Sequence, residues 1–160
     1  IRVKTDEREG FSPGYKFNDW EMRGVPLRIE IGPRDVAKGT VVLARRDRPG
    51  KEGKSFVSRD NLAAAVEKML VEIQTSLYER ALAFRKANTV ETDSYQEFKV
   101  AVEKGFAYSY WCGSAACEEK IKVETKATMR CIPLDQAAGQ GRCVFCAQPA
   151  REKAIFAKAY

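Results

Sequence analysis

Five cysteines supply the most distinctive chemistry of the sequence, and all of them lie in its last third. Four form two close pairs, C-x4-C in CGSAAC and C-x2-C in CVFC, with 25 residues between the pairs: Cys112, Cys117, Cys143 and Cys146. This spacing is typical of structural zinc, where each pair occupies a tight turn and four thiolates complete a tetrahedron. Gly113 and Ser114 suit the first turn, and GQGR and AQP flank the second. The sequence therefore predicts a structural zinc site.

Other uses of these thiols remain open. Disulfides suit a secreted protein, but an odd cysteine count would leave one thiol unpaired. A redox pair would need a single C-x-x-C at a helix N-terminus, whereas CVFC is followed by Pro149 in a predicted loop. Catalytic zinc is disfavoured because four sulfur ligands leave no open coordination position. Cys131, in MRCIPL, is predicted to be a small core residue.

Composition and charge bound the class of protein. The chain has 160 residues, 44% of them hydrophobic, and a net charge of +6, which is compatible with a globular protein that has a polyanionic partner. No apolar run approaches the roughly 20 residues that would span a bilayer, and no signal peptide is recognisable. We therefore expect no membrane partner and a cytoplasmic location. The opening IRVKTDEREG has no initiator Met, so we expect the chain to be cut from a longer protein.

Apolar periodicity predicts the elements of the first half. We expect a strand over residues 1–6, and a short helix in KFNDWEMRG whose apolar side is Phe17, Trp20 and Met22. VPLRIEIG alternates as a strand does, with Val25, Leu27, Ile29 and Ile31 on its apolar face and Arg28 and Glu30 on a free polar face. PRDVAKG is predicted to be a turn, and TVVLARRD and SFVS to be paired strands.

The longest predicted helix starts at Ser58 or Asp60 and ends near Lys86. Its apolar stripe should be core: Leu62, Val66, Met69, Leu70, Ile73, Leu77, Ala81 and Phe84. Beyond it we expect a helix from SYQEF to Gly105 with a Ser94–Glu97 capping box, and a short helix in ACEEKIKVE. The predicted strands are FAYSYWC, ATMRCIP and AIFAKAY, and LDQAAGQGR is predicted to be a flexible connector. The fold class is therefore an α/β mixed sheet followed by a small α+β zinc-binding domain.

The usual catalytic constellations are missing. Without histidine there is no Ser-His or Cys-His nucleophile, and no glycine-rich phosphate loop is present. The chain alone is not expected to be a complete enzyme.

The densest group of functional residues lies in GYKFNDWEMRGVPLRIEIGPRD. Aromatic rings stack on unpaired RNA bases, arginine can donate to guanine O6 and N7, and carboxylates can accept from guanine N1–H and N2–H2. This stretch could therefore bind one or two guanines. The alternative is that the aromatics are core and the charges form surface pairs, and local sequence alone does not separate the two interpretations.

The same stretch resembles the anticodon-binding domain of class II prolyl-tRNA synthetases, and more narrowly the archaeal/eukaryotic-type enzymes, which some bacteria also carry. The resemblance covers essentially the whole chain and includes four further motifs: TSLYERALAFRKAN, CGSAAC, RCVFC and IFAKAY. It implies an anticodon-binding domain over residues 1–88, lacking its first strand and helix, and a C-terminal zinc-binding domain over residues 89–160. It also implies that the catalytic domain, with ATP and Mg, lies outside this chain.

Carried over residue by residue, the resemblance implies contacts to the two guanines shared by proline anticodons. Phe17 would pack beside a base, Glu21 and Asp35 would accept from guanine, Arg28 and Arg34 would donate to base or phosphate, and Lys51 would add a basic contact. Cys112, Cys117, Cys143 and Cys146 match the family's zinc ligands, and the Tyr160 carboxylate would face the catalytic domain. The parent would be a homodimeric ligase that joins proline to its tRNA using ATP. The alternative is a non-enzymatic zinc-containing module that binds RNA or protein.

Overall fold

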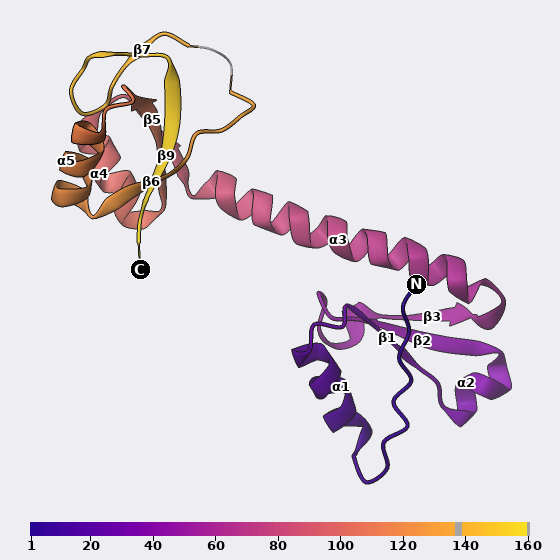
Figure 1. The fold of residues 1–160 in the computed structure, drawn as a ribbon. Helices are drawn as coiled ribbons and strands as arrows, with labels where there is room; N and C mark the ends of the chain where they lie inside the picture. Colours follow the sequence, from indigo (N-terminus) through magenta and orange to yellow (C-terminus); the bar gives the residue numbers. More distant parts are fainter. Residues whose placement is uncertain (137–138, 160) are drawn as a thin grey trace. The chain divides into compact units, whose positions relative to one another are not determined.

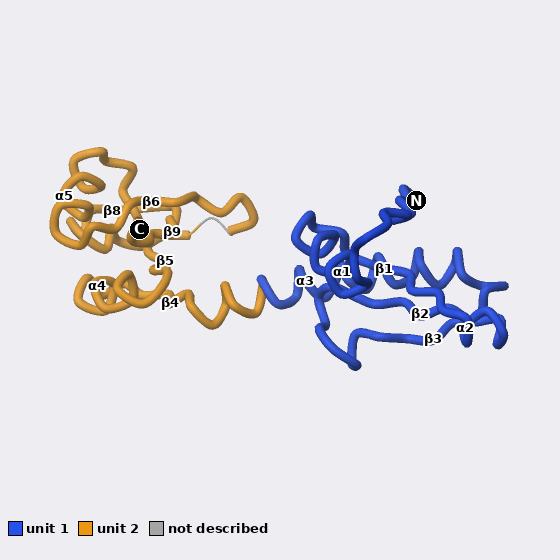
Figure 2. The backbone as a smooth tube through the Cα atoms, turned by 90° about the horizontal axis from the view of Figure 1, so that it is seen from below, with its two compact units in different colours: residues 1–81 blue, residues 82–160 orange. Residues whose placement is uncertain are grey.

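The computed structural model describes residues 1–136 and 139–159 (Figure 1). The chain divides into two units, residues 1–81 and residues 82–160 (Figure 2). The boundary falls within one long helix, α3 (Leu62–Ala87). The domain boundary expected between residues 88 and 89 stays a prediction. No helix among the described residues has the length and apolar character needed to cross a membrane.

The first unit is built on a three-stranded antiparallel sheet with strand order β1-β2-β3. Its strands are β1 (Leu27–Glu30), β2 (Thr40–Arg45) and β3 (Lys54–Ser58), so the pairing predicted for TVVLARRD and SFVS is confirmed. Side chains alternate between faces along each strand. Val41 and Leu43 of β2 face α3 and form a core with Val66. Val42 and Ala44 face the opposite side, where α1 (Pro13–Met22) lies (Figure 1).

Local chemistry explains how the two short helices of this unit begin and end. Ser12 caps α1 by accepting a hydrogen bond from the Tyr15 N–H. The predicted turn PRDVAKG is instead a helix, α2 (Pro33–Lys38), so that prediction was wrong. Asp35 accepts from the Gly32 N–H at its start, and Gly39 ends it in the left-handed conformation at φ 65°. Two short 3-10 helices complete the unit, η1 (Gly50–Gly53) and η2 (Arg59–Asn61).

Several apolar positions of the first half are not core as predicted. Residues 1–6 form no strand, because the described sheet offers them no paired neighbour. Met22, the last residue of α1, is 89% exposed. Ile29, on the edge strand β1, and Ile31, just after it, are also exposed, whereas Leu27 of the same predicted face packs against the core. The stripe on α3 is core at Val66 and Ile73, but Phe84 is 66% exposed.

The second unit contains a four-stranded mixed sheet, β4-β5-β9-β6, covered on one face by two helices (Figure 1). The strands are β4 (Thr89–Glu91), β5 (Phe106–Trp111), β6 (Ala127–Cys131) and β9 (Glu152–Lys158). The helices are α4 (Tyr95–Lys104) and α5 (Ala115–Thr125), and a two-stranded hairpin joins β7 (Gly141–Arg142) to β8 (Pro149–Ala150). Phe98, Ile121 and Phe156 are fully buried between helices and sheet.

The helices and strands predicted for this half are present, but β4, β7 and β8 were not predicted, and β7 lies within the predicted connector LDQAAGQGR. Ser94 accepts from the Glu97 N–H, but the Glu97 carboxylate accepts from the Thr92 hydroxyl, which in turn accepts from the Ser94 N–H. In place of the direct bond from the Ser94 N–H to Glu97 that a capping box requires, the Thr92 hydroxyl links the two groups. Cys131 is exposed rather than core, because it ends an edge strand beside a register shift. The predicted connector LDQAAGQGR includes residues 137–138, which lie outside the described part.

Candidate metal centre and nucleic-acid interface

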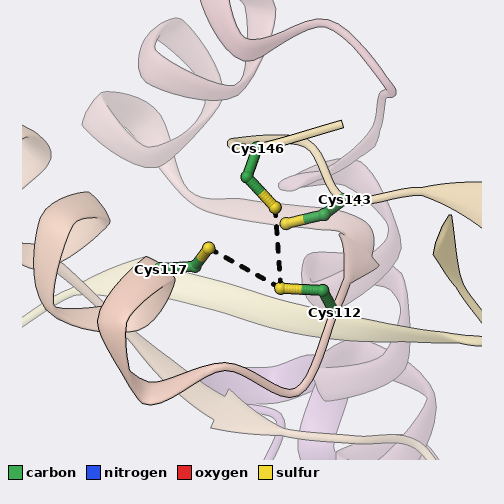
Figure 3. Close-up of side chains that lie close together, drawn as sticks. All are labelled: Cys112, Cys117, Cys143 and Cys146. Carbon is green, nitrogen blue, oxygen red and sulfur yellow. Dashed lines mark hydrogen bonds between the residues drawn. The ribbon is translucent and has the colours of Figure 1, made fainter. Parts of the chain in front are cut away.

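Two loops of the second unit bring four cysteines together (Figure 3). Cys112 directly follows β5, and Cys117 lies in the first turn of α5. Cys143 follows β7, and Cys146 lies in the turn that leads to β8. The cluster predicted from the spacing is thus assembled, and Cys131 is not part of it.

The sulfur positions fit a tetrahedral metal. Cys112 Sγ lies 3.6 Å from Cys117 Sγ and 3.7 Å from Cys146 Sγ, and all four sulfurs lie within 4.8 Å of one another. A regular tetrahedron with Zn–S bonds of about 2.3 Å has S···S edges of about 3.8 Å. Disulfide sulfurs would be about 2 Å apart, and the five cysteines are all free. The donor set suits one thiophilic ion with no open position.

Backbone geometry holds both turns in place. Gly113 has φ +80°, a conformation that side-chain-bearing residues rarely adopt, and it lets the chain turn between Cys112 and α5. In the second turn the Cys143 N–H donates to the Gln148 carbonyl at 2.8 Å. The Val144 N–H donates to the Tyr110 carbonyl at 3.0 Å and so ties this turn to β5.

The thiols differ in acidity. Burial raises the pKa of the Cys117 thiol to about 12, and the neighbouring thiols add to the effect. A backbone hydrogen bond from Gln148 lowers the pKa of Cys146 to about 7. Four thiolates this close together would repel one another unless a cation lay between them.

A second polar cluster lies in the first unit, between α1 and the strand that follows it. Arg28 Nη1 lies 2.5 Å from Glu21 Oε1, and Arg28 Nε donates to Glu30 Oε1 at 3.0 Å. The Arg28 Cζ atom stands 4.0 Å above the centre of the Phe17 ring, which is a cation–π contact. Three of the predicted RNA-contacting residues, Phe17, Glu21 and Arg28, therefore form one group.

Strand register brings Lys54 to the same group. Arg28 pairs with Ala44, and Ala44 pairs with Lys54, so the three residues point to one face across the sheet. The small Ala44 side chain leaves room above it, and Lys54 Nζ reaches Glu30 Oε2 at 2.8 Å. Although burial by itself would raise the pKa of Glu30, its hydrogen bonds with Lys54 and Arg28 hold that pKa below the usual value.

The remaining predicted contacts lie on other elements of this unit. Arg34 is exposed on α2, and the Asp35 carboxylate accepts from the Gly32 N–H. Lys51 is exposed on η1. A small hollow beside Arg28 is lined by Trp20, Glu21, Val25, Arg28, Ala44 and Arg46. Asp35 is not among the described residues that line it.

Sequence reasoning missed four residues of this face. Glu30 and Lys54 contact the group directly, Arg46 lines the hollow, and Phe56 is exposed on the same side of β3. The alternation in VPLRIEIG places Glu30 on the same polar face as Arg28, which the structure confirms, but it does not indicate that Glu30 contacts Arg28. Lys54 and Phe56 depend on the register between β2 and β3, which the sequence does not state.

Arg45, at the end of β2, is a structural cation. Arg45 forms two hydrogen bonds with the Asp47 carboxylate, at 3.0 and 2.8 Å, and approaches Glu72 of α3 at 3.3 Å. The side chains of Arg45 and Asp47 are only 7% and 1% exposed. The bonds from Arg45 lower the pKa of Asp47. This pair fixes the end of β2 and is not available to a ligand.

The segment before α1 anchors the helix that carries Phe17 and Glu21. Asp6 accepts from the Arg8 side chain and from Trp20 Nε1, the latter at 2.8 Å, and Arg8 also pairs with Asp19 at 2.8 Å. The hydrogen bonds from Arg8 are the main reason why the pKa of Asp6 is lowered. Trp20, predicted as an apolar helix residue, thus also has a polar role.

Two family models match the chain, one in each unit. Residues 1–69 match the anticodon binding domain, and residues 95–160 match the family described as prolyl-tRNA synthetase, C-terminal. The first match contains the Phe17, Glu21 and Arg28 group, and the second contains the four-cysteine cluster.

Curated relatives match over the whole chain. A proline–tRNA ligase of Chloroflexus aggregans is 56% identical over 160 residues, which are 100% of this chain and 33% of the relative. A proline–tRNA ligase of Roseiflexus castenholzii is 51% identical over the same coverage. The proline–tRNA ligase, chloroplastic/mitochondrial, of Arabidopsis thaliana is 51% identical over 164 residues, 100% of this chain and 30% of the relative. The chain thus spans about a third of the length of these relatives.

Proposed function

We propose that this chain reads the anticodon of proline tRNA within a proline–tRNA ligase, because residues 1–69 match the anticodon-binding domain family and residues 95–160 match the C-terminal domain family of prolyl-tRNA synthetases. The ligase would attach proline to its tRNA in an ATP-dependent reaction. Its ATP and Mg would be bound by a catalytic domain outside these residues. The role of this chain would be to recognise the anticodon and to support the structure of the ligase.

The observation that carries the proposal is the position of Arg28. Its guanidinium lies on the ring of Phe17 and donates to Glu21, so one cation, one carboxylate and one aromatic face meet at one point. These groups match the complementary edges of guanine, whose O6 and N7 accept hydrogen bonds and whose N1–H and N2–H2 donate them. A bound guanine could replace the Glu21–Arg28 contact, because it could accept hydrogen bonds from Arg28 and donate them to Glu21.

The other three predicted contacts extend this proposal. Arg34 and Lys51 are exposed cations suited to a phosphate or a second base. Asp35 would have to give one oxygen to a base while the other keeps its bond to the Gly32 N–H. We assign these three residues to the second guanine or to the adjacent phosphates.

The metal centre completes the proposal. Cys112, Cys117, Cys143 and Cys146 would hold one structural zinc ion, a fit supported by the S···S distances. Zinc would supply the cross-link between the turn after β5 and the turn before β8, and these residues would do no catalysis.

Four finer assignments rest on the sequence resemblance. We propose an archaeal/eukaryotic-type class II parent, a homodimeric assembly and a cytoplasmic location. We also keep the Tyr160 carboxylate as a contact to the catalytic domain, although Tyr160 lies outside the described residues.

The test is a binding comparison with two RNAs. One is the anticodon stem-loop of proline tRNA, and the other is the same stem-loop with both anticodon guanines replaced by adenine. We expect the guanine stem-loop to bind at least tenfold more tightly at the same salt concentration. Equal binding of both RNAs, with a steep dependence on salt, would favour the alternative of a non-specific zinc-containing RNA-binding module.

A further inference from the structure

Arg28 is held by two carboxylates that differ in their surroundings. Glu21 lies in the last turn of α1 and its side chain is 41% exposed, whereas Glu30 lies on β1 and its side chain is 19% exposed. Glu21 contacts Nη1 of Arg28, and Glu30 contacts Nε and Nη2 at 3.0 and 2.9 Å. The two carboxylates therefore occupy different parts of the same guanidinium.

Glu30 is also the more firmly fixed partner. Its second oxygen accepts from Lys54 of β3 at 2.8 Å, so its carboxylate bridges two strands of the sheet. Among the described side chains, Glu21 forms a hydrogen bond with Arg28 alone. A ligand that approaches Arg28 could displace Glu21 at little cost, because water can solvate the freed carboxylate. Displacing Glu30 would break its bonds to both Arg28 and Lys54.

We propose that Glu30 is a positioning residue for guanine recognition: it holds the Arg28 guanidinium on the Phe17 ring in a fixed orientation, while Glu21 is released to the incoming base. This inference rests on the proposed function and extends it by separating the two carboxylates. Glu21 touches the base, whereas Glu30 acts through Arg28.

Orientation matters here because arginine reads guanine through a planar pair of N–H donors. With Glu30 holding Nε and Nη2, Nη1 is the donor that Glu21 gives up on ligand binding. Without the Glu30 carboxylate, Arg28 would keep its charge and its attraction to phosphate but lose its fixed plane. The effect should therefore fall on selectivity between bases more than on affinity for RNA.

The test measures the ratio of affinities for the guanine stem-loop and for the adenine-substituted stem-loop, at temperatures below the melting of each variant. Glu30→Gln removes the charge, and Glu30→Asp keeps the charge but withdraws the carboxylate by one methylene group. We expect both changes to lower the ratio, Glu30→Gln by about tenfold, with unchanged or stronger binding of the adenine stem-loop. Glu67→Gln is the matched control, because Glu67 is exposed on α3 of the same unit, and its ratio should equal that of the unaltered chain.

A purely structural role for Glu30 makes a different prediction. It would shift the melting temperature and lower the affinity for both RNAs in proportion, with no change in their ratio. In an Arg28→Ala background Glu30→Gln should have no further effect on the ratio, because the positioned group is gone. An unaltered ratio in both Glu30 variants, in a chain that itself prefers guanine, would overturn the positioning role alone. A ratio near one for the unaltered chain would instead refute the proposed function.

Discussion

Arg28 and Glu21, two residues proposed to read a guanine, are each other's partners in the chain without RNA, with Nη1 and Oε1 2.5 Å apart. The contact joins the last turn of α1 to β1 and lies beside the Phe17 ring. It keeps a carboxylate next to the cation until a ligand arrives. In the proposed complex, an RNA phosphate would gain little from Arg28 unless the base also satisfied Glu21, which would favour guanine over non-specific binding.

Glu21→Gln should therefore raise the affinity for RNA in general while it reduces the preference for guanine. The change removes a negative charge next to the phosphate backbone and leaves Arg28 with one carboxylate partner. We expect the adenine-substituted stem-loop to bind several-fold more tightly and the guanine-to-adenine affinity ratio to fall, both measured by fluorescence titration. Weaker binding of both RNAs by the same factor would count against this account.

The Arg45–Asp47 pair makes stability at acidic pH dependent on one carboxyl group. Its pKa is lowered in the folded chain, so its stabilising effect is present above the unfolded value of about 4 and is lost as pH falls through the folded pKa. Asp47→Asn leaves Arg45 buried without its main partner, and we expect about 3 kcal/mol of lost stability at pH 7.

Hydrogen exchange of the β2 amides measures this loss in the first unit alone. The difference between Asp47→Asn and the unaltered chain should shrink below about pH 4, where Asp47 becomes protonated in the unfolded state. Glu79→Gln, an exposed change on α3 in the same unit, should show no such difference at either pH. A constant difference at all pH values would show that the pair acts through packing rather than charge.

Loss of the metal should affect the two units unequally. Cys143→Ser removes one of the four proposed ligands, and we expect the bound zinc, near one per chain, to be lost. Amides from residue 106 onward should then exchange faster, while those of β2 stay protected, because all four ligands lie in the second unit. Mass spectrometry of metal content and of hydrogen exchange measures both effects.

Cys131→Ser is the control for this change, because Cys131 is exposed and lies outside the cluster. It should leave the metal content and the exchange pattern intact. Faster exchange in β2 than in β5 or β9 after Cys143→Ser would contradict the assignment of the metal to the second unit.

The sequence predicted those features that depend on local pattern. The two cysteine pairs assemble as their spacing indicated, and the strand predicted in TVVLARRD is present as β2. The capping residue Ser94 and the terminating Gly105 also bound α4 as expected. In each of these cases a few neighbouring residues determine the conformation.

Features that are too short for a periodic pattern, or that depend on pairing between distant segments, were missed. α2 forms because the Asp35 carboxylate caps it and Gly39 ends it, although six residues are too few for a periodic signal. The partnership of Glu30 with Lys54 follows from strand register, which no short motif states. Phe84 continues the periodicity of α3, yet it is exposed because periodicity does not show where a packing neighbour ends. The roles of Arg34, Asp35 and Lys51 stay predictions.

The energetic coupling between Arg28 and the anticodon guanines tests the central claim most directly. Four dissociation constants are needed: those of the unaltered chain and of Arg28→Ala, each with the guanine stem-loop and with the adenine-substituted stem-loop. If Arg28 reads guanine, Arg28→Ala should weaken binding of the guanine stem-loop by about 1–3 kcal/mol more than binding of the adenine stem-loop. An equal loss with both RNAs would contradict guanine recognition by Arg28 and reduce its role to attraction of the phosphate backbone.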